Sequence, residues 1–345
     1  MSFFSNGIIT VDPSTMLPGM IMQYAQPTGA FRLLPGESPD VRLGSIDLVA
    51  YQKYLRIRTK TQSGQSMWAQ LPSVSIVPNY DQMKTYRIAT RTNYQMYDEE
   101  GARVWGISLP EALRLGARQG IAQTLRNYLL YGAYAATDRG QYEGVTNAPN
   151  AYRPILPADS NGNAGYAMYD NGEFAQYLLS SMAATKARTY QLGMPSRFVF
   201  LGPQRFLTKI MYSGIIQLTS YQRDGAGSDV IAGMIKDVAG KVGGDEVIFA
   251  ADDTLEGKGQ GGTDLIIMSI PEIKVPENQA EINTNIFATL TPNQQAMTTM
   301  LCDVAAPTEV VSPMPDGGTT TVYTIRTTPG WNLRSEGLTL LSAAY

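Results

Sequence analysis

The strongest local signal in this sequence predicts one long helix. Ser108 precedes Glu111 by three residues, the spacing of a capping box in which two side chains bond free backbone N–H groups at a helix start. Apolar residues then recur at helical spacing up to about Leu130. A helix of roughly 22 residues measures ~33 Å at 1.5 Å per residue. Two interior glycines, Gly116 and Gly120, weaken an isolated helix, so we expect close packing to support them.

A second face of this predicted helix is basic. Three arginines stand along it at intervals of four and eight residues, namely Arg114, Arg118 and Arg126. Because helical residues three or four positions apart are neighbours, we expect one basic stripe. Such a stripe fits either an ordinary solvated surface or a contact with a partner, and the sequence alone leaves both open.

The stretch Leu48–Tyr80 contains no acidic residue. Residues 54–61 alternate between the two faces of a strand, a turn is expected at 62–65, and extended chain returns through Trp68 towards Val77. This pattern predicts a long hairpin with a cationic face. The basic residues of the hairpin are Lys53, Arg56, Arg58 and Lys60. A solvated strand face is one interpretation, but the complete lack of acids favours docking on a partner's acidic patch or on nucleic-acid phosphates.

The remaining segments mix strands and helices, which predicts an α+β fold. Residues 1–46 contain many turn formers and no sustained period, so they fit an extended arm. Strands are expected at residues 86–96, 197–201, 246–250, 264–270 and 319–328. One helix is expected at about 171–192, with Asp170 and Glu173 as a weaker capping box at its start. A second is expected after Pro203, with Phe206, Leu207, Ile210 and Met211 pointing inward. A third is expected at 230–238.

Composition excludes several kinds of site. The chain has 345 residues, no histidine and one cysteine, Cys302. Catalytic Ser-His-Asp and Cys-His sites, imidazole-bound metals and an intramolecular disulfide are therefore excluded, and we expect no cofactor. A net charge of −3 gives no global reason to bind nucleic acid or a membrane, and no uncharged run reaches the ~18 apolar residues of a membrane span. We expect a protein made in the cytosol without a membrane segment.

Charged residues are few, and residues that suit contacts are many. Charged side chains make up 17% of the chain, against ~25% in ordinary soluble domains. The 20 tyrosines, 16 methionines and 3 tryptophans fit extensive protein–protein contact, where aromatic residues and Met are enriched. A protein with large hydrophobic cores alone would also contain many of these residues.

Three short motifs with potential chemistry are better explained as loops. Gly257–Gly262 satisfies G-x-G-x-x-G, but a strand follows where a dinucleotide site needs a helix N-terminus. Asp159–Asn163 resembles the start of a calcium loop but lacks its glycine and final glutamate, so a polar turn is favoured. The acidic runs Asp98–Glu100 and Asp252–Asp253 have no nucleophile or positioned base beside them. We therefore expect solvated loop charges and no enzyme activity.

The order of these features resembles a known protein family. The run Tyr94–Glu100, the helix from Leu109 and the turn Gly144–Asn147 are similar in order to the major capsid proteins of tailed bacteriophages, which have the Hong Kong 97-type capsid fold. The glycine-rich loop at 257–262, between apolar strands, is also similar to that family. Encapsulins, the shells of cellular nanocompartments, are similar in fold, so the resemblance does not separate virus from compartment.

The resemblance implies a division of the chain into parts. These are an N-terminal arm at 1–46, an extended E-loop hairpin at 47–82, a peripheral domain at 83–196, an axial domain at 197–270 and return strands at 271–345. Within the peripheral domain the resemblance implies a spine helix at about 109–130 and a second helix at about 171–192.

The resemblance also implies a structural function. The chain would assemble with copies of itself, as hexamers and pentamers, into an icosahedral head that encloses double-stranded DNA. The contacting residues would be Lys53, Arg56, Arg58, Lys60 and Trp68 on the E-loop, with Arg114, Arg118 and Arg126 facing DNA or another subunit. Portal, scaffold and decoration proteins are further candidate partners. The protein would assemble in the host bacterial cytoplasm and reside in the virion.

Three alternatives remain at this stage. One is an encapsulin-like shell that encloses a cargo enzyme. The second is an α/β enzyme that binds a phosphate ligand at Gly257–Gly262, which would require a helix directly after Gly262. The third is a tail or adaptor protein that forms rings or tubes.

Overall fold

The computed structural model of the chain describes residues 29–35, 43–44, 46–58, 75–104, 106–133, 143–189, 191, 194–212, 235–236, 238–240, 243–273, 298–300, 308–315 and 317–345. Within these ranges the side chains of residues 29, 30, 54–58, 75, 76, 212 and 300 are not described. Several predictions lie outside the described residues. They concern the hairpin turn with Lys60 and Trp68, Cys302, most of the arm at 1–46 and most of the helix at 230–238.

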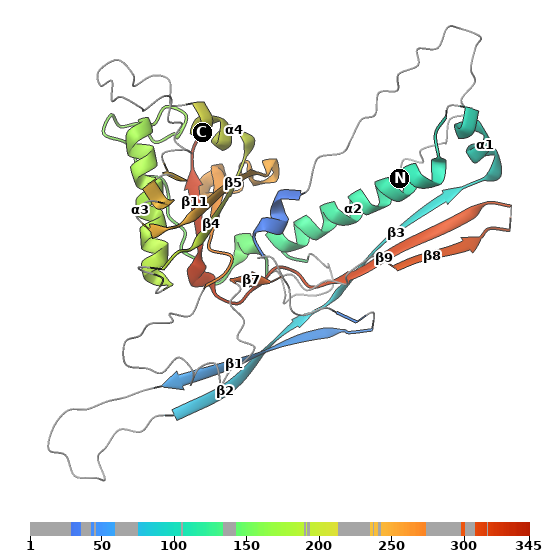
Figure 1. The fold of residues 1–345 in the computed structure, drawn as a ribbon, viewed down its shortest axis with the longest axis horizontal. Coiled ribbons are helices and arrows are strands. Elements are labelled where there is room, and N and C mark those ends of the chain that lie inside the picture. The colour runs from blue at the N-terminus through green and yellow to red at the C-terminus, as the bar shows by residue number, and fades with distance from the viewer. Residues whose placement is uncertain are drawn as a thin grey trace, which may run out of the picture. The chain divides into compact units, whose positions relative to one another are not determined.

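The described residues group into two compact units, and the first is built on a three-stranded sheet (Figure 1). Its described part lies mainly within residues 87–124 and 306–325. The strands lie in the order β3 (Tyr86–Tyr94), β9 (Thr319–Thr327) and β8 (Thr308–Pro313). Along β9 every second residue is buried, including Tyr323 and Ile325, which is the alternation of a sheet with one covered face.

The long helix is confirmed almost to the residue. Helix α2 runs from Leu109 to Tyr131, and its buried stripe includes Ala117, Ile121 and Leu125. The sequence leads us to expect other parts of the chain to pack closely around the two interior glycines, Gly116 and Gly120. This prediction is wrong for the described part of the subunit. A Cβ atom built on either glycine would meet no described atom within 4 Å, because the buried stripe starts ~100° further round the helix.

A short helix that the sequence did not predict precedes α2. Helix α1 spans Met96–Val104, so the acidic run Asp98–Glu100 lies in a helix and not in a loop. The Asp98 carboxylate accepts a hydrogen bond from the backbone N–H of Gln95 (3.0 Å) at the helix start. Arg103 pairs with Glu99 one turn away (2.9 Å). None of the nine residues of α1 is buried, so the helix has no apolar stripe that sequence periodicity could reveal.

The second unit contains a four-stranded mixed sheet with the order β11-β6-β4-β5 (Figure 1). Its strands are β4 (Arg197–Gly202), β5 (Glu246–Ala251), β6 (Asp264–Ser269) and β11 (Leu338–Ala343). β4 and β5 are parallel, and the other two pairs are antiparallel. The strands expected at 197–201, 246–250 and 264–270 are thereby confirmed. The sequence did not predict β11.

Helices α3 (Asn171–Arg188) and α4 (Gln204–Tyr212) share one hydrophobic core with this sheet. The core contains Phe174, Leu178 and Met182 from α3, Phe206 and Ile210 from α4, and Phe198, Phe200, Ile266, Met268, Leu341 and Ala343 from the sheet. Since α3 and β4 belong to one core, the boundary implied at residue 196 does not separate two cores. Met211, expected to point inward, is exposed.

The predicted start of α3 is confirmed, although its capping box is wrong. The Asp170 side chain accepts hydrogen bonds from the N–H groups of Gly172 and Glu173, as an N-cap does. The carboxylate of Glu173 accepts from the backbone N–H of Ser160 instead of the N-cap residue (2.9 Å). The helix ends at Arg188, four residues before the expected end.

Part of the expected N-terminal arm is core. The short 3-10 helix at Gly29–Leu33 precedes Leu34, and the side chains of Phe31, Leu34 and Leu43 are buried. The interpretation of 1–46 as one extended arm is therefore wrong for the described residues 29–35 and for Leu43.

Candidate assembly surfaces

The predicted hairpin is a two-stranded antiparallel ribbon. Strand β1 (Val49–Arg58) pairs with β2 (Ser75–Lys84) along its whole length, from Val49 opposite Lys84 to Arg58 opposite Ser75. No third strand joins this sheet among the described residues. Since an isolated two-stranded ribbon is marginally stable in water, its described length must be supported at the base or by a partner.

The base of the ribbon is fixed by two residues from late in the sequence. Trp331 is buried against Leu43, Ala50 and Met83, and its indole N–H donates to the Asp81 carboxylate (3.0 Å). Arg326 donates to the backbone carbonyl of Asp47 (2.7 Å). Beyond this base, the described side chains of the ribbon are mostly exposed.

The strand register places Lys53 apart from the other predicted basic positions of the ribbon. Residues an odd number apart on a strand take opposite faces, so Lys53 is not on the face of positions 56 and 58. We call the face of Lys53 the aromatic face; its exposed residues are Tyr51, Lys53, Pro78, Tyr80, Gln82 and Lys84. The rings of Tyr51 and Tyr80 meet edge to face with centroids 6.1 Å apart.

The three arginines of α2 do not form one exposed stripe. Arg114 pairs with Glu309 of β8 (2.7 Å), and Arg118 is exposed. Arg126 is buried, with its guanidinium 3.9 Å from the buried carboxylate of Asp252. Eight residues turn a helix through ~800°, so Arg126 lies ~80° away from Arg118 around the axis. Of the predicted basic face, only Arg118 is left as a freely exposed charge.

The turn at Gly144–Asn147 caps the end of α2. The Thr146 hydroxyl donates to the carbonyl of Leu130 (2.7 Å), and the Gly330 N–H donates to that of Tyr128 (3.0 Å). The Leu130 carbonyl belongs to the last turn, whose carbonyls lack a helical N–H four residues on, whereas the Tyr128 carbonyl also accepts from the Gly132 N–H (3.1 Å). The approach needs glycine, since a Cβ on Gly144 would lie 2.4 Å from the backbone nitrogen of Gly132.

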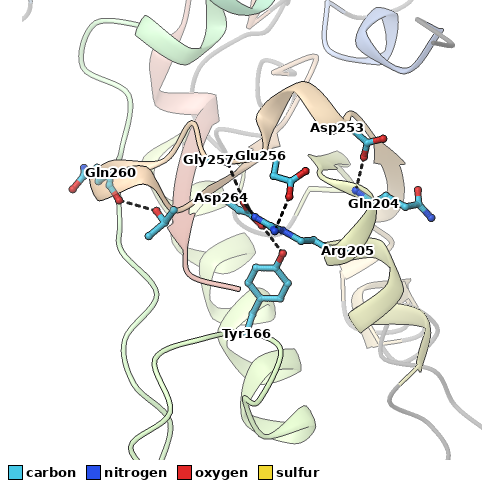
Figure 2. Close-up of polar contacts among 9 residues, drawn as sticks. Tyr166, Gln204, Arg205, Asp253, Glu256, Gly257, Gln260 and Asp264 are labelled. Atoms are coloured by element: carbon cyan, nitrogen blue, oxygen red, sulfur yellow. Dashed lines mark hydrogen bonds and ion pairs between the residues drawn. The ribbon is translucent and has the colours of Figure 1, made fainter. Parts of the chain in front are cut away.

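A buried carboxylate organises the end of the second unit's sheet. Asp264, the first residue of β6, is fully buried and accepts from the Arg205 guanidinium through two nitrogens. It also accepts from the Tyr166 hydroxyl (2.6 Å) and the Gly257 N–H (3.1 Å). Figure 2 shows Arg205 between Asp264, Glu256 and Tyr166, with Glu256 2.6 Å from a third guanidinium nitrogen. With both oxygens occupied, Asp264 fastens α4 to the glycine loop and has no role as a free base.

The same cluster positions the start of α4. The Asp253 carboxylate accepts from the N–H of Gln204 (3.0 Å), so an anion lies at the helix N-terminus (Figure 2). The Arg205 guanidinium also lies over the Tyr345 ring, 4.7 Å from its centroid. These contacts join α4, the β5–β6 connection and the segment before α3.

The pKa values in the cluster shift in opposite directions. Burial alone would raise the pKa of Asp264, but hydrogen bonds from Arg205, Tyr166 and Gly257 outweigh it and hold the pKa below its ordinary value. Burial raises the pKa of the Tyr166 hydroxyl, and its hydrogen bond to Asp264 raises it further. The cluster is therefore held in one charge state, with ionised Asp264 and neutral Tyr166, across neutral pH.

These shifts predict how the cluster affects stability as pH changes. The contribution of Asp264 is present above its ordinary pKa of 3.8 and is lost as pH falls through its lower folded-state value. The contribution of Tyr166 is present below 10.0 and is lost as pH rises through its raised value. The measurement compares the melting temperature of the wild type with that of the double variant Arg205→Met, Asp264→Asn. The difference between the two should be constant between about pH 5 and 9 and shrink below about pH 4. A difference that stays constant down to pH 2 would contradict this account.

The glycine loop lacks the geometry of a phosphate site. After Gly262 comes Thr263 and then strand β6, without the helix that would present free N–H groups to a pyrophosphate. The loop instead bonds to Asp264 through Gly257. The alternative of a phosphate-binding enzyme is therefore not supported by the described structure.

The predicted polar turn at Asp159 is confirmed. Its carboxylate accepts from the N–H groups of Asn161 (3.0 Å), Asn163 (2.7 Å) and Asp170 (3.2 Å). Burial opposes the ionised form, yet these bonds and one from the Asn163 amide lower the pKa of Asp159. Among the described residues, no group of three metal-ligating side chains occurs, and no described helix is long and apolar enough to cross a membrane.

Comparison with known proteins identifies the fold. No protein-family model matches the sequence, and no curated protein matches it. The chain aligns over 98% of its length with 100% of a chain in the capsid of Myoviridae phage XM1, with a TM-score of 0.67 and 9% identity. It aligns over 97% of its length with 96% of a capsid chain of the empty GTA particle (TM-score 0.56, 12% identity). For the capsid of cyanophage P-SCSP1u, the alignment covers 96% of this chain and 93% of that chain (TM-score 0.56, 12% identity).

The chain therefore has the Hong Kong 97-type capsid fold, an α+β architecture, as the resemblance implied. The alignments span nearly the full length of both chains, so they include the ribbon and α2 as well as the four-stranded sheet.

Proposed function

We propose that this chain is the major capsid protein of a tailed double-stranded-DNA bacteriophage and that it assembles with itself into an icosahedral head. One observation carries the proposal: chains from phage capsids match its fold over nearly all of their length and its own. A fold alone does not define a function. The proposal gains support from described surfaces that the subunit leaves uncovered, which suit contacts with further copies.

In the proposed assembly the subunits act by binding and not by catalysis. The ribbon reaches a neighbouring subunit, and its cations at Lys53, Arg56, Arg58 and Lys60 set the register of the contact more than its affinity. Trp68 would add an aromatic contact. Hexamers and pentamers of the chain would close the shell, which encloses DNA, and portal, scaffold or decoration proteins would join it. Assembly would take place in the host bacterial cytoplasm, and the mature protein would reside in the virion.

Electron microscopy of the purified full-length protein tests the proposal. Closed icosahedral particles are the expected result, and particles isolated from a producing cell should contain DNA. A chain that remains monomeric at high concentration would overturn the proposal. Rings or tubes would instead indicate a tail or adaptor protein, and closed shells filled with another protein would indicate an encapsulin-like compartment.

Charge reversal tests the basic residues of the ribbon separately. The variant Arg56→Glu, Arg58→Glu, Lys60→Glu should remain folded by circular dichroism but form no particles, because repulsion replaces attraction at the contact. Removal of residues 1–28, which stops before the buried Phe31 and Leu34, should also block assembly without unfolding the subunit. Unchanged particles from the charge-reversed variant would show that these charges are only solvated.

A further inference from the structure

Helix α1 is an exposed helix with the chemistry of a contact surface. Met96, Tyr97 and Val104 are 66%, 82% and 80% exposed, and no residue of the helix is buried. Covering such apolar side chains favours a contact, because it removes their surface from water. A nine-residue helix is also shorter than the ~12 residues that make an isolated helix even marginally stable. A partner that covers α1 would therefore stabilise both the helix and the contact.

The residues of α1 form an ordered stripe. Tyr97, Glu100 and Val104 are spaced at i, i+3 and i+7, so they share one face. A carboxylate thus lies between two apolar side chains, which span ~10.5 Å along the axis. Gly101 lies in the same stripe, and a Cβ added to it would meet nothing within 4 Å. A second surface can therefore approach the helix closely at this point.

The aromatic face of the ribbon is the complement of this stripe. Lys53 lies directly opposite Tyr80 in the strand register, and Tyr51 packs edge to face on Tyr80. Tyr51 and Tyr80 are 62% and 66% exposed, and Lys53 is exposed as well. A cation here lies beside two aromatic rings, with ~6.7 Å between Tyr51 and Lys53 along the strand. On each surface a charged group therefore lies beside two apolar or aromatic side chains.

The charges of the two surfaces are also complementary. Three of the nine residues of α1 are acidic and one, Arg103, is basic, while the sequence Leu48–Tyr80 has no acidic residue. Complementary charge speeds the encounter of two surfaces and aligns them, and apolar contact keeps the surfaces together once they have met. A second copy of the chain supplies both surfaces in equal number, as a head-to-tail contact in a closed ring requires.

We propose that the aromatic face of the ribbon in one copy docks on helix α1 of a second copy, with Lys53 against Glu100 and the tyrosines against Tyr97 and Val104. This inference rests on the proposed assembly of the chain and names the contact surfaces within it. It concerns the aromatic face alone, and the contact proposed above for positions 56 and 58 belongs to the opposite face of the ribbon.

Zero-length cross-linking in assembled particles tests the contact. Particles are formed from equal amounts of unlabelled and heavy-nitrogen-labelled chain and treated with a carbodiimide, which joins an amine and a carboxylate that touch. Mass spectrometry should find Lys53 joined to Glu100 or Glu99, with both isotopes in one cross-linked pair. Particles in which Lys53 joins only other carboxylates, or only those of its own chain, would overturn this inference while leaving the proposed function intact. An absence of particles would overturn the proposed function itself.

Reciprocal charge reversal adds a test of specificity. Lys53→Glu and Glu100→Lys should each raise the concentration needed for assembly about tenfold, since ~1.4 kcal/mol is a factor of ten. The double variant should return to within about threefold of the wild type. As a matched control, Lys53→Glu combined with Glu111→Lys, an exposed acid on α2, should not be rescued. Equal rescue by both pairs, or no effect of the single variants, would contradict the assigned contact.

Discussion

Replacing Gly144 by alanine is expected to lower the free energy of unfolding by about 2–4 kcal/mol. The new Cβ would lie 2.4 Å from the backbone nitrogen of Gly132 and 2.7 Å from the carbonyl oxygen of Leu130. Neither backbone atom can move without opening the end of α2. The cost combines overpacking, typically ~1–3 kcal/mol, with a weakened buried hydrogen bond from Thr146, about 1 kcal/mol. Urea unfolding of the unassembled subunit measures the loss.

The same helix offers a matched control. Gly116→Ala introduces the same methyl group where no described atom lies within 4 Å. Alanine favours the helix over glycine by ~0.5–1 kcal/mol, so this variant should be slightly more stable than the wild type. If Gly144→Ala and Gly116→Ala have similar stabilities, the close approach at the end of α2 does not constrain the fold.

Replacing Arg205 by methionine is expected to cost about 3–5 kcal/mol of stability. The substitution keeps much of the side-chain volume but leaves Asp264, which is fully buried, without a counter-charge. An unpaired buried charge is far more costly than the loss of an exposed pair. Adding Asp264→Asn should restore part of the stability, because it removes the remaining charge.

An exposed ion pair serves as the comparison for Arg205. Arg103→Met breaks the pair between Arg103 and Glu99 on α1, where the arginine side chain is 74% exposed. Such pairs contribute ~0–1 kcal/mol, so this variant should unfold almost as the wild type does. A loss below ~1 kcal/mol for Arg205→Met would show that solvent or rearrangement replaces the guanidinium, and the account of the cluster would be wrong.

Sequence reasoning succeeded where the signal was local. The capping box at Ser108 and the apolar stripe through Leu125 lie within the helix that they define, so the bounds of α2 could be predicted closely. The ribbon could be predicted because its alternation and its missing acids are also local. By contrast, α1 was missed because none of its residues is buried and its acids resemble a loop.

Features that depend on distant residues could not be predicted. Arg126 follows the helical spacing of an exposed stripe, and only the approach of Asp252 shows that it is buried. The importance of Arg205 depends on Asp264, which the sequence shows merely as an acid before an apolar run. The acid at the start of the buried strand β6, Asp264, is the one feature of the local sequence that points to the cluster around Arg205. The faces of the ribbon required the strand register, which separates Lys53 from positions 56 and 58.

The cap on α2 has a consequence for the time course of folding. One of its donors, Gly330, and one strand of each larger sheet, β9 and β11, come late in the sequence. A chain still emerging from the ribosome therefore cannot complete either sheet or form the hydrogen bond from Gly330 to the end of its long helix. Non-local pairing of this kind slows folding. Only a fully synthesised chain can therefore complete the fold.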